Sequence, residues 1–533
     1  MDKKTDESCV NGAYVVVDAL VDNGVNVFFS NPGTSEIHLV SAIDKHAGAR
    51  AVLCLFEGVA TGAADGYGRV CDRPAAVLLH LGPGLANGLA NLHNAAKANT
   101  PMVVIVGDHA TNHLEFDTPL RSDLPSLANF AAKAVFSMRP GDDLRAIIGE
   151  AVSTANALPR GPVVLLANAD VMWLPTKAVE STPASAPLAP PAQHGVDAQQ
   201  LQRAITLLKQ GDKTLLLVGG DVLTEENLAL VDRISQATGC TVFCETFNAR
   251  HERGAGVSAI TRLPYMADVA VPLLADIAQC VLIGAGRPVA FFASPEARSE
   301  LTRPDVEFWE LADEIPVQPV LKQLAQYLAP AVEGRRSPRE LTEPQDGPLT
   351  PRSIWSVMNQ LLPYGAIVAD ESGVTSVGAD VMMTVANRHT WLNLTGGAIG
   401  QGLPMATGAA IGCANAPVVA VHGDGGAMYT LQALWTQQRE KLRVVNIIFR
   451  NDSYSILEYE VKRHGLGPLG EKGKSMFALT NPTLDWVHLA QGMGMAARAV
   501  ESVAEFQEVL STAFESSGPA LIEVRLSRHR GAG

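Results

Sequence analysis

The chain has 533 residues, of which 47% are hydrophobic and 18% charged, and its formal net charge is −14. With roughly 100–200 residues per domain, this length predicts about three domains with packed cores. The acidic balance, without a run of Lys or Arg, argues against a nucleic-acid partner. The longest apolar runs have six to eight residues, which suits buried strands and is too short to span a membrane.

The seven cysteines are scattered along the chain, a pattern typical of reduced thiols rather than of a disulfide framework. The N-terminal segment MDKKTDESCVNG is polar and lacks an apolar core, so we expect no signal peptide. Together with the acidic balance, these features predict a cytoplasmic location.

Short apolar runs alternate with Gly-containing turns and Ala/Leu-rich helical segments along the whole chain. Examples are VNVFFSNPGTSEIHL and PMVVIVGDH, then TLLLVGGDV and CVLIGAG, and finally AIVADES, APVVAVHGDGG and VVNIIFRND. This alternation predicts parallel sheets covered by helices on both faces. Linkers rich in Pro, near residues 176–193 and 330–351, divide the chain. We therefore expect an α/β protein with three doubly wound parallel-sheet domains, at residues 1–180, 195–330 and 350–533.

The strongest local signal lies in HGDGGAMYTLQALWTQQREKLRVVNIIFRNDSY. Asp424 follows an apolar strand in a Gly-Asp-Gly turn, and Asn451 follows the next strand after an intervening helix. A strand–helix–strand crossover brings both residues to neighbouring strand ends. With the backbone carbonyl of Ser453 they form a hard-oxygen site that suits Mg²⁺. Phosphates can approach the backbone at the small residues beside it, Gly423, Gly425, Gly426 and Ala427.

This spacing resembles the thiamine-diphosphate-binding motif of the family that includes benzoylformate decarboxylase, pyruvate decarboxylase and acetolactate synthase. A Gly-Asp-Gly turn alone would carry no such meaning. The motif usually ends in Asn-Asn or Asn-Gly, whereas Asp452 stands here, at a position that is not a metal ligand in the family. The resemblance covers nearly the whole chain. It implies thiamine diphosphate and Mg²⁺ as cofactors, and pyrimidine-binding, central and diphosphate-binding domains in that order.

Two segments of the first domain resemble the family's cofactor and substrate residues. AVLCLFEGVATGAADGYGRV resembles its glutamate segment, which implies that Glu57 protonates the aminopyrimidine ring of the cofactor. Burial at the strand end is expected to raise the pKa of Glu57. FSNPGTSE resembles its Asn-Pro-Gly-Ser/Thr turn, which places Thr34 toward the substrate. A helix N-cap is the alternative interpretation of Thr34.

Two segments of the third domain extend the resemblance. NLTGGAIGQGLPMATGAAIG resembles the segment that holds the cofactor bent, with Ile399, followed by Gly400, between its two rings. The bend brings the 4′-imine close to the carbon that must lose a proton. ADESGVTS resembles a phosphate-contacting loop, with Ser372 and Thr375 as its hydroxyl candidates. The family resemblance also implies a site between subunits, so a homodimer is the minimum assembly and a homotetramer is expected.

The substrate side combines features of two subfamilies. His80, in VLLHLGPG, resembles the position of a catalytic histidine of benzoylformate decarboxylase, whereas the Gly-Pro-Gly after it resembles acetolactate synthases. A histidine there could move protons to and from the substrate; a buried structural histidine is the alternative. The second histidine of benzoylformate decarboxylase is missing, because Phe291 and Phe292 occupy that region.

Further pocket candidates follow two other strands. His109 and His113 lie in a loop after MVVIV and could supply the missing proton donor; a surface loop is the alternative. Ile456 and Leu457, beyond Asn451, resemble the helix that lines the substrate pocket in the decarboxylases.

The sequence thus leads to the hypothesis of a 2-oxo acid decarboxylase that can also act as a carboligase on small 2-oxo acids. An acetolactate-synthase-like transfer of a two-carbon unit to a second 2-oxo acid is the alternative. The Arg-Phe-Asp-Asp segment of FAD-containing acetolactate synthases is missing, so FAD is not expected. A non-catalytic regulatory homologue is disfavoured by Glu57, Asp424 and Asn451. A dehydrogenase is disfavoured because VGGDV and IGAGR lack a complete G-x-G-x-x-G.

Overall fold

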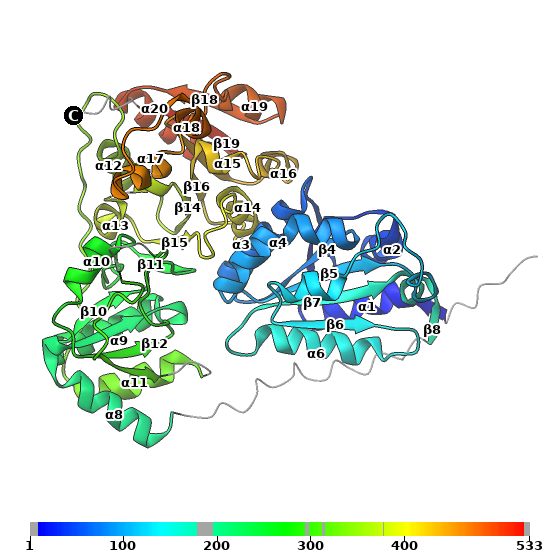
Figure 1. The fold of residues 1–533 in the computed structure, drawn as a ribbon, viewed down its shortest axis with the longest axis horizontal. Coiled ribbons are helices and arrows are strands. Elements are labelled where there is room, and N and C mark those ends of the chain that lie inside the picture. The colour runs from blue at the N-terminus through cyan, green and yellow to red at the C-terminus, as the bar shows by residue number, and fades with distance from the viewer. Residues whose placement is uncertain (1–8, 178–195, 294–297, 312–314, 377, 527–533) are drawn as a thin grey trace, which may run out of the picture.

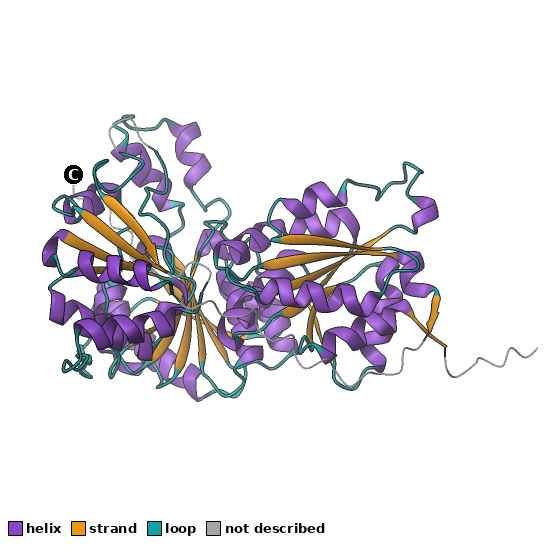
Figure 2. Cartoon of the chain, turned by 90° about the horizontal axis from the view of Figure 1, so that it is seen from below, coloured by secondary structure: helices purple, strands orange, loops and turns teal. Residues whose placement is uncertain are grey.

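The computed structural model describes residues 9–177, 196–293, 298–311, 315–376 and 378–526. They form three sheets covered by helices, which confirms the predicted α/β class with several parallel-sheet domains (Figure 2). None of the described helices has the length and apolar character needed to cross a membrane.

The first sheet has six parallel strands in the order β3-β2-β4-β5-β7-β6. The strands are β2 (Val27–Asn31), β3 (Arg50–Leu53), β4 (Ala75–Leu79), β5 (Met102–Asp108), β6 (Ala134–Met138) and β7 (Pro162–Asn168). The helices are α1 (Gly12–Asp22), α2 (Ile37–Lys45), α3 (Glu57–Cys71), α4 (Leu81–Lys97), α5 (Leu124–Asn129), α6 (Leu144–Asn156) and α7 (Ala169–Trp173), with short 3-10 turns η1 (Thr34–Glu36) and η2 (Thr111–His113). An antiparallel pair, β1 (Cys9–Asn11) and β8 (Pro175–Lys177), lies beside them.

The middle sheet has four parallel strands in the order β10-β9-β12-β13. The strands are β9 (Thr214–Val218), β10 (Thr241–Cys244), β12 (Gln279–Ile283) and β13 (Glu307–Leu311). The helices and 3-10 turns are α8 (Ala198–Leu208), α9 (Glu225–Thr238), α10 (Ala267–Leu273), α11 (Val317–Leu328), η3 (Gly211–Lys213) and η4 (Gly220–Val222). A cavity of about 870 Å³ lies between the ends of these strands and the first domain, lined among others by Gly220, Glu245 and Arg160.

The third sheet has seven strands in the order β11-β15-β14-β16-β17-β19-β18. The strands are β11 (His251–Arg253), β14 (Ala366–Glu371), β15 (His389–Asn393), β16 (Val418–Gly423), β17 (Val444–Arg450), β18 (Ala496–Val500) and β19 (Ala520–Arg525). The helices and 3-10 turns are α12 (Pro351–Leu361), α13 (Ala379–Met382), α14 (Gly402–Gly412), α15 (Asp424–Ala427), α16 (Ala433–Arg439), α17 (Ser455–Arg463), α18 (Glu471–Phe477), α19 (Trp486–Gly492), α20 (Val503–Glu515), η5 (Gly373–Ser376) and η6 (Met383–Val385).

One strand of the third sheet comes from the middle of the chain. β11 pairs antiparallel with β15, whereas the other pairs of this sheet are parallel. The predicted middle range 195–330 therefore contains a strand that belongs to the third sheet.

Helices α3 and α14 pack closely at the junction of the first and third domains (Figure 1). Glycines permit this contact, because a Cβ atom on Gly66 would lie 2.0 Å from the Met405 carbonyl oxygen and one on Gly408 would lie 1.7 Å from that of Ala63. A single hydrophobic core contains residues of both helices and of the sheets on either side. The Ala/Gly-rich composition of the two segments thus serves close helix packing.

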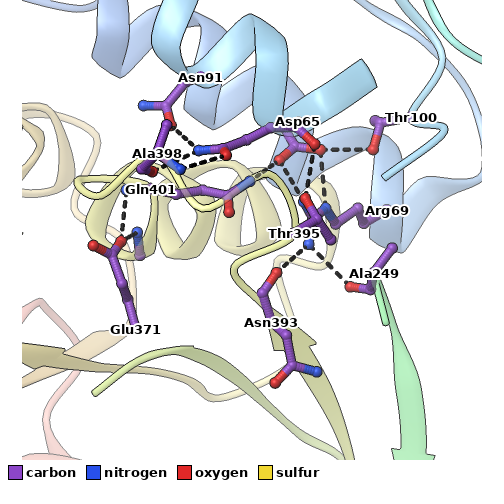
Figure 3. Close-up of polar contacts among 12 residues, drawn as sticks. Asp65, Arg69, Asn91, Thr100, Ala249, Glu371, Asn393, Thr395, Ala398 and Gln401 are labelled. Carbon is purple, nitrogen blue, oxygen red and sulfur yellow. Dashed lines mark hydrogen bonds and ion pairs between the residues drawn. The ribbon is translucent and has the colours of Figure 1, made fainter. Parts of the chain in front are cut away.

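A buried ion pair at this junction reaches all three domains (Figure 3). Arg69 donates to both carboxylate oxygens of Asp65, and their side chains are 1% and 0% exposed. The same guanidinium donates to the carbonyl of Ala249 in the middle segment, and to the carbonyl of Asn393 and the hydroxyl of Thr395 in the third domain. Its hydrogen bonds fix the three domains relative to one another.

Replacing Arg69 with Met should destabilise the protein by about 3–5 kcal/mol, because Asp65 would keep a buried, uncompensated charge. A lower Tm and a lower urea midpoint would show this. Arg498→Met is the matched control, since Arg498 and Glu508 form an exposed pair worth at most about 1 kcal/mol. Equal Tm shifts for the two variants would contradict the structural role of Arg69.

Candidate functional site

In the third domain, two neighbouring parallel strands end side by side, as the sequence predicts. β16 and β17 pair in parallel, so Asp424, directly after β16, and Asn451, directly after β17, lie at neighbouring strand ends. Asp424 is 2% exposed, and its carboxylate accepts hydrogen bonds from the backbone N–H groups of Gly425 and Asp452, at 3.0 and 2.8 Å. Burial raises the pKa of Asp424 to about 6. A bound cation would compensate this buried charge.

The residues around Asn451 fit a magnesium ion held partly by phosphate. The Asn451 amide oxygen accepts from the Ser453 N–H at 3.0 Å, and its amide nitrogen donates to Ser455 at 2.6 Å. Asp452 has a positive φ of 59°, and its side chain accepts from Arg450. In the part of the chain that the structure describes, no cluster of three His, Cys, Asp or Glu side chains could hold a metal. One carboxylate, one amide and backbone carbonyls leave positions for phosphate and water oxygens, as Mg²⁺ favours.

The loop after Asp424 differs from the expected long helix. The sequence predicts the intervening helix over MYTLQALWTQQRE, residues 428–440, but α16 begins only at Ala433, so the first five residues of that range are not helical. The short helix α15 ends at Ala427, before the predicted range. Glycines make room for neighbouring side chains: a Cβ atom on Gly425 would lie 2.4 Å from the Tyr454 ring. Gly423, the last residue of β16, has open space at its Cβ position.

The turn Ile399–Gly402 lies directly against this loop. Gly400 has a positive φ of 94°, and its carbonyl accepts from Thr430 at 2.8 Å and from Asn91 of the first domain at 3.3 Å. Ile399 is 38% exposed, which leaves its side chain accessible to a ligand.

A carboxylate that the sequence analysis did not single out holds this turn. Glu371, at the end of β14, accepts from the backbone N–H groups of Gly400, Gln401 and Gly402 at 2.6–2.7 Å. The ring of His422 lies 3.0 Å from the same carboxylate. Burial opposes the charge of Glu371, but His422 and the backbone donors outweigh it and lower the pKa of Glu371. The sequence signal that could have identified Glu371 was the acidic pair in ADES, which follows an apolar strand.

The two hydroxyl candidates beside Glu371 are buried. Ser372 is 3% exposed and its hydroxyl donates to Asp370 at 2.6 Å. Thr375 is also 3% exposed, and its carbonyl accepts from the Trp355 indole at 2.7 Å. In this conformation both therefore make contacts within the domain.

A second group of predicted residues gathers in the first domain. His80 lies between β4 and α4, and its Nδ1 lies 2.8 Å from the Glu36 carboxylate, whose side chain is 0% exposed. Glu36 also accepts from the Gly33 N–H at 2.7 Å. Gly33 and Gly107 make room, because Cβ atoms there would lie 2.2 Å from the His80 ring and 1.7 Å from Glu36. Sequence reasoning missed Glu36, although it lies within the quoted segment FSNPGTSE.

Glu57 begins α3 beside His80. An added Cβ at Gly84 would lie 3.5 Å from both Glu57 Oε1 and His80 Cβ. The Glu57 carboxylate accepts from Asn87 at 3.1 Å and is only half-buried, so the expected burial is incomplete in a single chain. Thr34 is exposed and begins η1, whose N-cap is Gly33, so Thr34 is not the N-cap of its turn.

The remaining candidates differ in exposure and in their neighbours. His113 is exposed and His109 half-buried, with their rings 5.5 Å apart. Phe291 packs against Phe292 with ring centroids 4.6 Å apart, and its ring lies 2.7 Å from an added Cβ at Gly397. On α17, Leu457 is 40% exposed and Ile456 half-buried.

Comparisons with known proteins agree with these motifs. The model of the N-terminal TPP binding domain of thiamine pyrophosphate enzymes matches residues 10–129, and that of the C-terminal TPP binding domain matches residues 372–524. Thiamine pyrophosphate is another name for thiamine diphosphate. The first match contains Glu57 and His80, and the second contains Asp424 and Asn451.

Two curated relatives span nearly the whole chain. The protein named "Putative acetolactate synthase large subunit IlvX" of Mycobacterium tuberculosis is 43% identical over 516 residues, covering 97% of this chain and 99% of that protein. Benzoylformate decarboxylase of Pseudomonas aeruginosa is 26% identical over 527 residues, covering 94% and 96%.

Solved structures share the fold. The thiamine-diphosphate-dependent 4-hydroxybenzoylformate decarboxylase of Rhodococcus jostii RHA1 superposes with a TM-score of 0.82 at 23% identity, covering 98% of this chain and 100% of that one. Benzoylformate decarboxylase of Polynucleobacter necessarius superposes with a TM-score of 0.80 at 20% identity, covering 97% and 99%.

These matches confirm the resemblance inferred from the motifs. The chain belongs to the thiamine-pyrophosphate-dependent enzymes, in the superfamily of acetolactate synthase and benzoylformate decarboxylase.

Proposed function

We propose that the chain is a Mg²⁺-dependent 2-oxo acid decarboxylase that can also act as a carboligase. The observation that supports this most is the buried carboxylate of Asp424, which faces backbone N–H groups beside Asn451 at a parallel strand end. When bound, thiamine diphosphate supplies a nucleophilic carbon and an electron sink for cleavage next to the 2-oxo group. Asp424 and Asn451 would hold the metal that neutralises its diphosphate, with Ser453 adding a backbone carbonyl.

The proposed site lies between two copies of the chain. Glu57 and His80 make their side-chain hydrogen bonds within the first domain, whereas Asp424 and Ile399 belong to the third. Large apolar side chains are exposed near both groups: Ile37 and Leu55 in the first domain, Ile399 and Tyr429 in the third. A second copy would cover these surfaces and complete the burial of Glu57, so a homodimer is the minimum and a homotetramer the expected assembly.

Glu57 and His80 have separate proton-transfer roles in this proposal. Glu57 holds or gives a proton at the pyrimidine nitrogen of the cofactor. His80 donates its Nδ1 proton to Glu36, which leaves Nε2 free to exchange a proton with the substrate. Thr34, exposed next to Gly33, is the proposed hydroxyl contact for the substrate carboxylate.

A synthase activity is the second candidate. The 43% identity to the acetolactate-synthase-named relative and the Gly-Pro-Gly after His80 favour transfer of a two-carbon unit to a second 2-oxo acid. Phe291 and Phe292, in place of a second histidine, also remove one proton donor expected of a decarboxylase.

Proton NMR of the protein with thiamine diphosphate, Mg²⁺ and a panel of aliphatic and aromatic 2-oxo acids separates these activities. We expect an aldehyde from at least one acid. An acetohydroxy acid as sole product would instead establish the synthase. Absence of any product, with the cofactor bound, would contradict both.

Mixing two inactive variants tests the site between copies. Glu57→Gln and Asp424→Ala should each abolish turnover, because one removes the proton donor and the other a metal ligand. After dissociation and reassociation of a 1:1 mixture, about one quarter of wild-type activity should return, since each mixed dimer then contains one intact site. Circular dichroism checks that both variants fold. If both groups came from one chain, mixing would restore nothing.

A double-mutant cycle tests the Glu36–His80 pair. His80→Ala should lower kcat by about 10²–10⁴-fold. Glu36→Gln keeps the shape but not the charge, so it should lower kcat by a smaller factor without changing cofactor affinity. In the double variant the loss should not exceed that of His80→Ala, because Glu36 acts through His80. Fully additive losses would assign Glu36 a purely structural role.

A further inference from the structure

We propose that Glu371 is a positioning residue that fixes the distance between the turn Ile399–Gly402 and the loop that begins at Asp424. The inference rests on the proposed function, which assigns Ile399 to the bent cofactor and Asp424 to its metal. Glu371 does not touch the reacting atoms in this proposal; it acts through the turn.

The carboxylate binds three consecutive backbone groups of the turn. Glu371 Oε1 accepts from the Gly400 N–H, and Oε2 accepts from the N–H groups of Gln401 and Gly402, at 2.6–2.7 Å. Helix α14 begins at Gly402, and its N-cap residue, Gln401, makes no side-chain capping bond. Glu371 therefore supplies the acceptor and the negative charge that free N–H groups at a helix start require.

The same carboxylate also lies against the loop that would hold the metal, residues 424–427, here called the metal loop. Glu371 and His422 are partners in the β14–β16 register, and His422 precedes Asp424 by two residues. Their side chains are 5% and 0% exposed, and the His422 ring nitrogen lies 3.0 Å from Glu371 Oε2. A Cβ atom on Gly426 would lie 2.9 Å from both side chains. The pair thus fills the space between the metal loop and the turn.

Two glycines, Gly402 on the turn and Gly426 in the metal loop, let both segments approach the Glu371–His422 pair closely. A Cβ atom on Gly402 would lie 2.7 Å from the His422 ring and 3.1 Å from Glu371 Cβ. The Gly400 carbonyl is in turn bound by Thr430, which follows the metal loop. The turn is therefore held through its N–H groups by Glu371, on β14, and through the Gly400 carbonyl by Thr430, on the segment after Asp424.

The first arm of the test uses the protein without cofactor. In Glu371→Gln, hydrogen exchange at the amides of Gly400–Gly402, followed by mass spectrometry of a peptide covering 396–405, should accelerate by about 10-fold or more, because charged hydrogen-bond acceptors are lost. Asp232→Asn is the matched control: Asp232 of the middle domain is a 7% exposed carboxylate that accepts from Gln236 and from Arg335 of the following linker. Unchanged exchange in Glu371→Gln, or equal acceleration in the control, would overturn the proposal.

The second arm uses the protein with thiamine diphosphate and Mg²⁺. Exchange of the cofactor's C2 proton, measured by NMR, should slow by about 100-fold in Glu371→Gln, because a displacement of about 1 Å costs that much in a proximity effect. The Kd for thiamine diphosphate should change much less. Accelerated amide exchange with an unchanged C2 rate would refute the positioning role. If wild-type protein bound no thiamine diphosphate, the proposed function would fail, while the amide exchange would still report on the contact itself.

Discussion

The relative placement of the three domains depends on one buried ion pair. Arg69 and Asp65 are both almost fully excluded from solvent, and such a pair is favourable only when its remaining donors and acceptors are satisfied. Here Arg69 donates to backbone carbonyls of the middle and third segments, and Asp65 accepts from Thr100 and Gln401 (Figure 3). Since Gln401 belongs to the turn that also carries Ile399, the ion pair fixes the proposed cofactor turn against α3, the helix that begins with Glu57.

The sequence predicted those features that depend on local pattern and on general rules of parallel sheets. Continuous apolar strands alternating with helices indicated the α/β class. The meeting of Asp424 and Asn451 followed because consecutive strands of a crossover lie side by side. The family motifs then indicated the cofactor, and the matches of both terminal domains agree with them. For the individual site residues, the motifs gave positions in the chain but not their contacts.

The contacts that escaped prediction join residues distant in sequence. Glu36 and Glu371 each lie in a quoted segment, but their roles become visible only when His80 and the turn at Gly400 are placed against them. The expected burial of Glu57 is incomplete for a related reason, because in the proposed homodimer it would depend on contacts from a second copy rather than on the chain itself. The late start of α16, at Ala433, also went unpredicted, since the residues from 428 to 432 have helical character and tertiary packing overrides it.

The edge strand β11 has a consequence for the order in which the protein is made. His251 pairs with Trp391, 140 residues later, and Arg253 binds Asp380 and lies over the Trp391 ring. During synthesis β11 leaves the ribosome long before β15, so the middle segment cannot complete its contacts when its own sheet is finished. Domains commonly fold one at a time as they emerge. In this chain β11 cannot pair until β15 has been made, so this contact between the middle segment and the third sheet has a high sequence separation and can form only after the strands of the middle sheet have been synthesised.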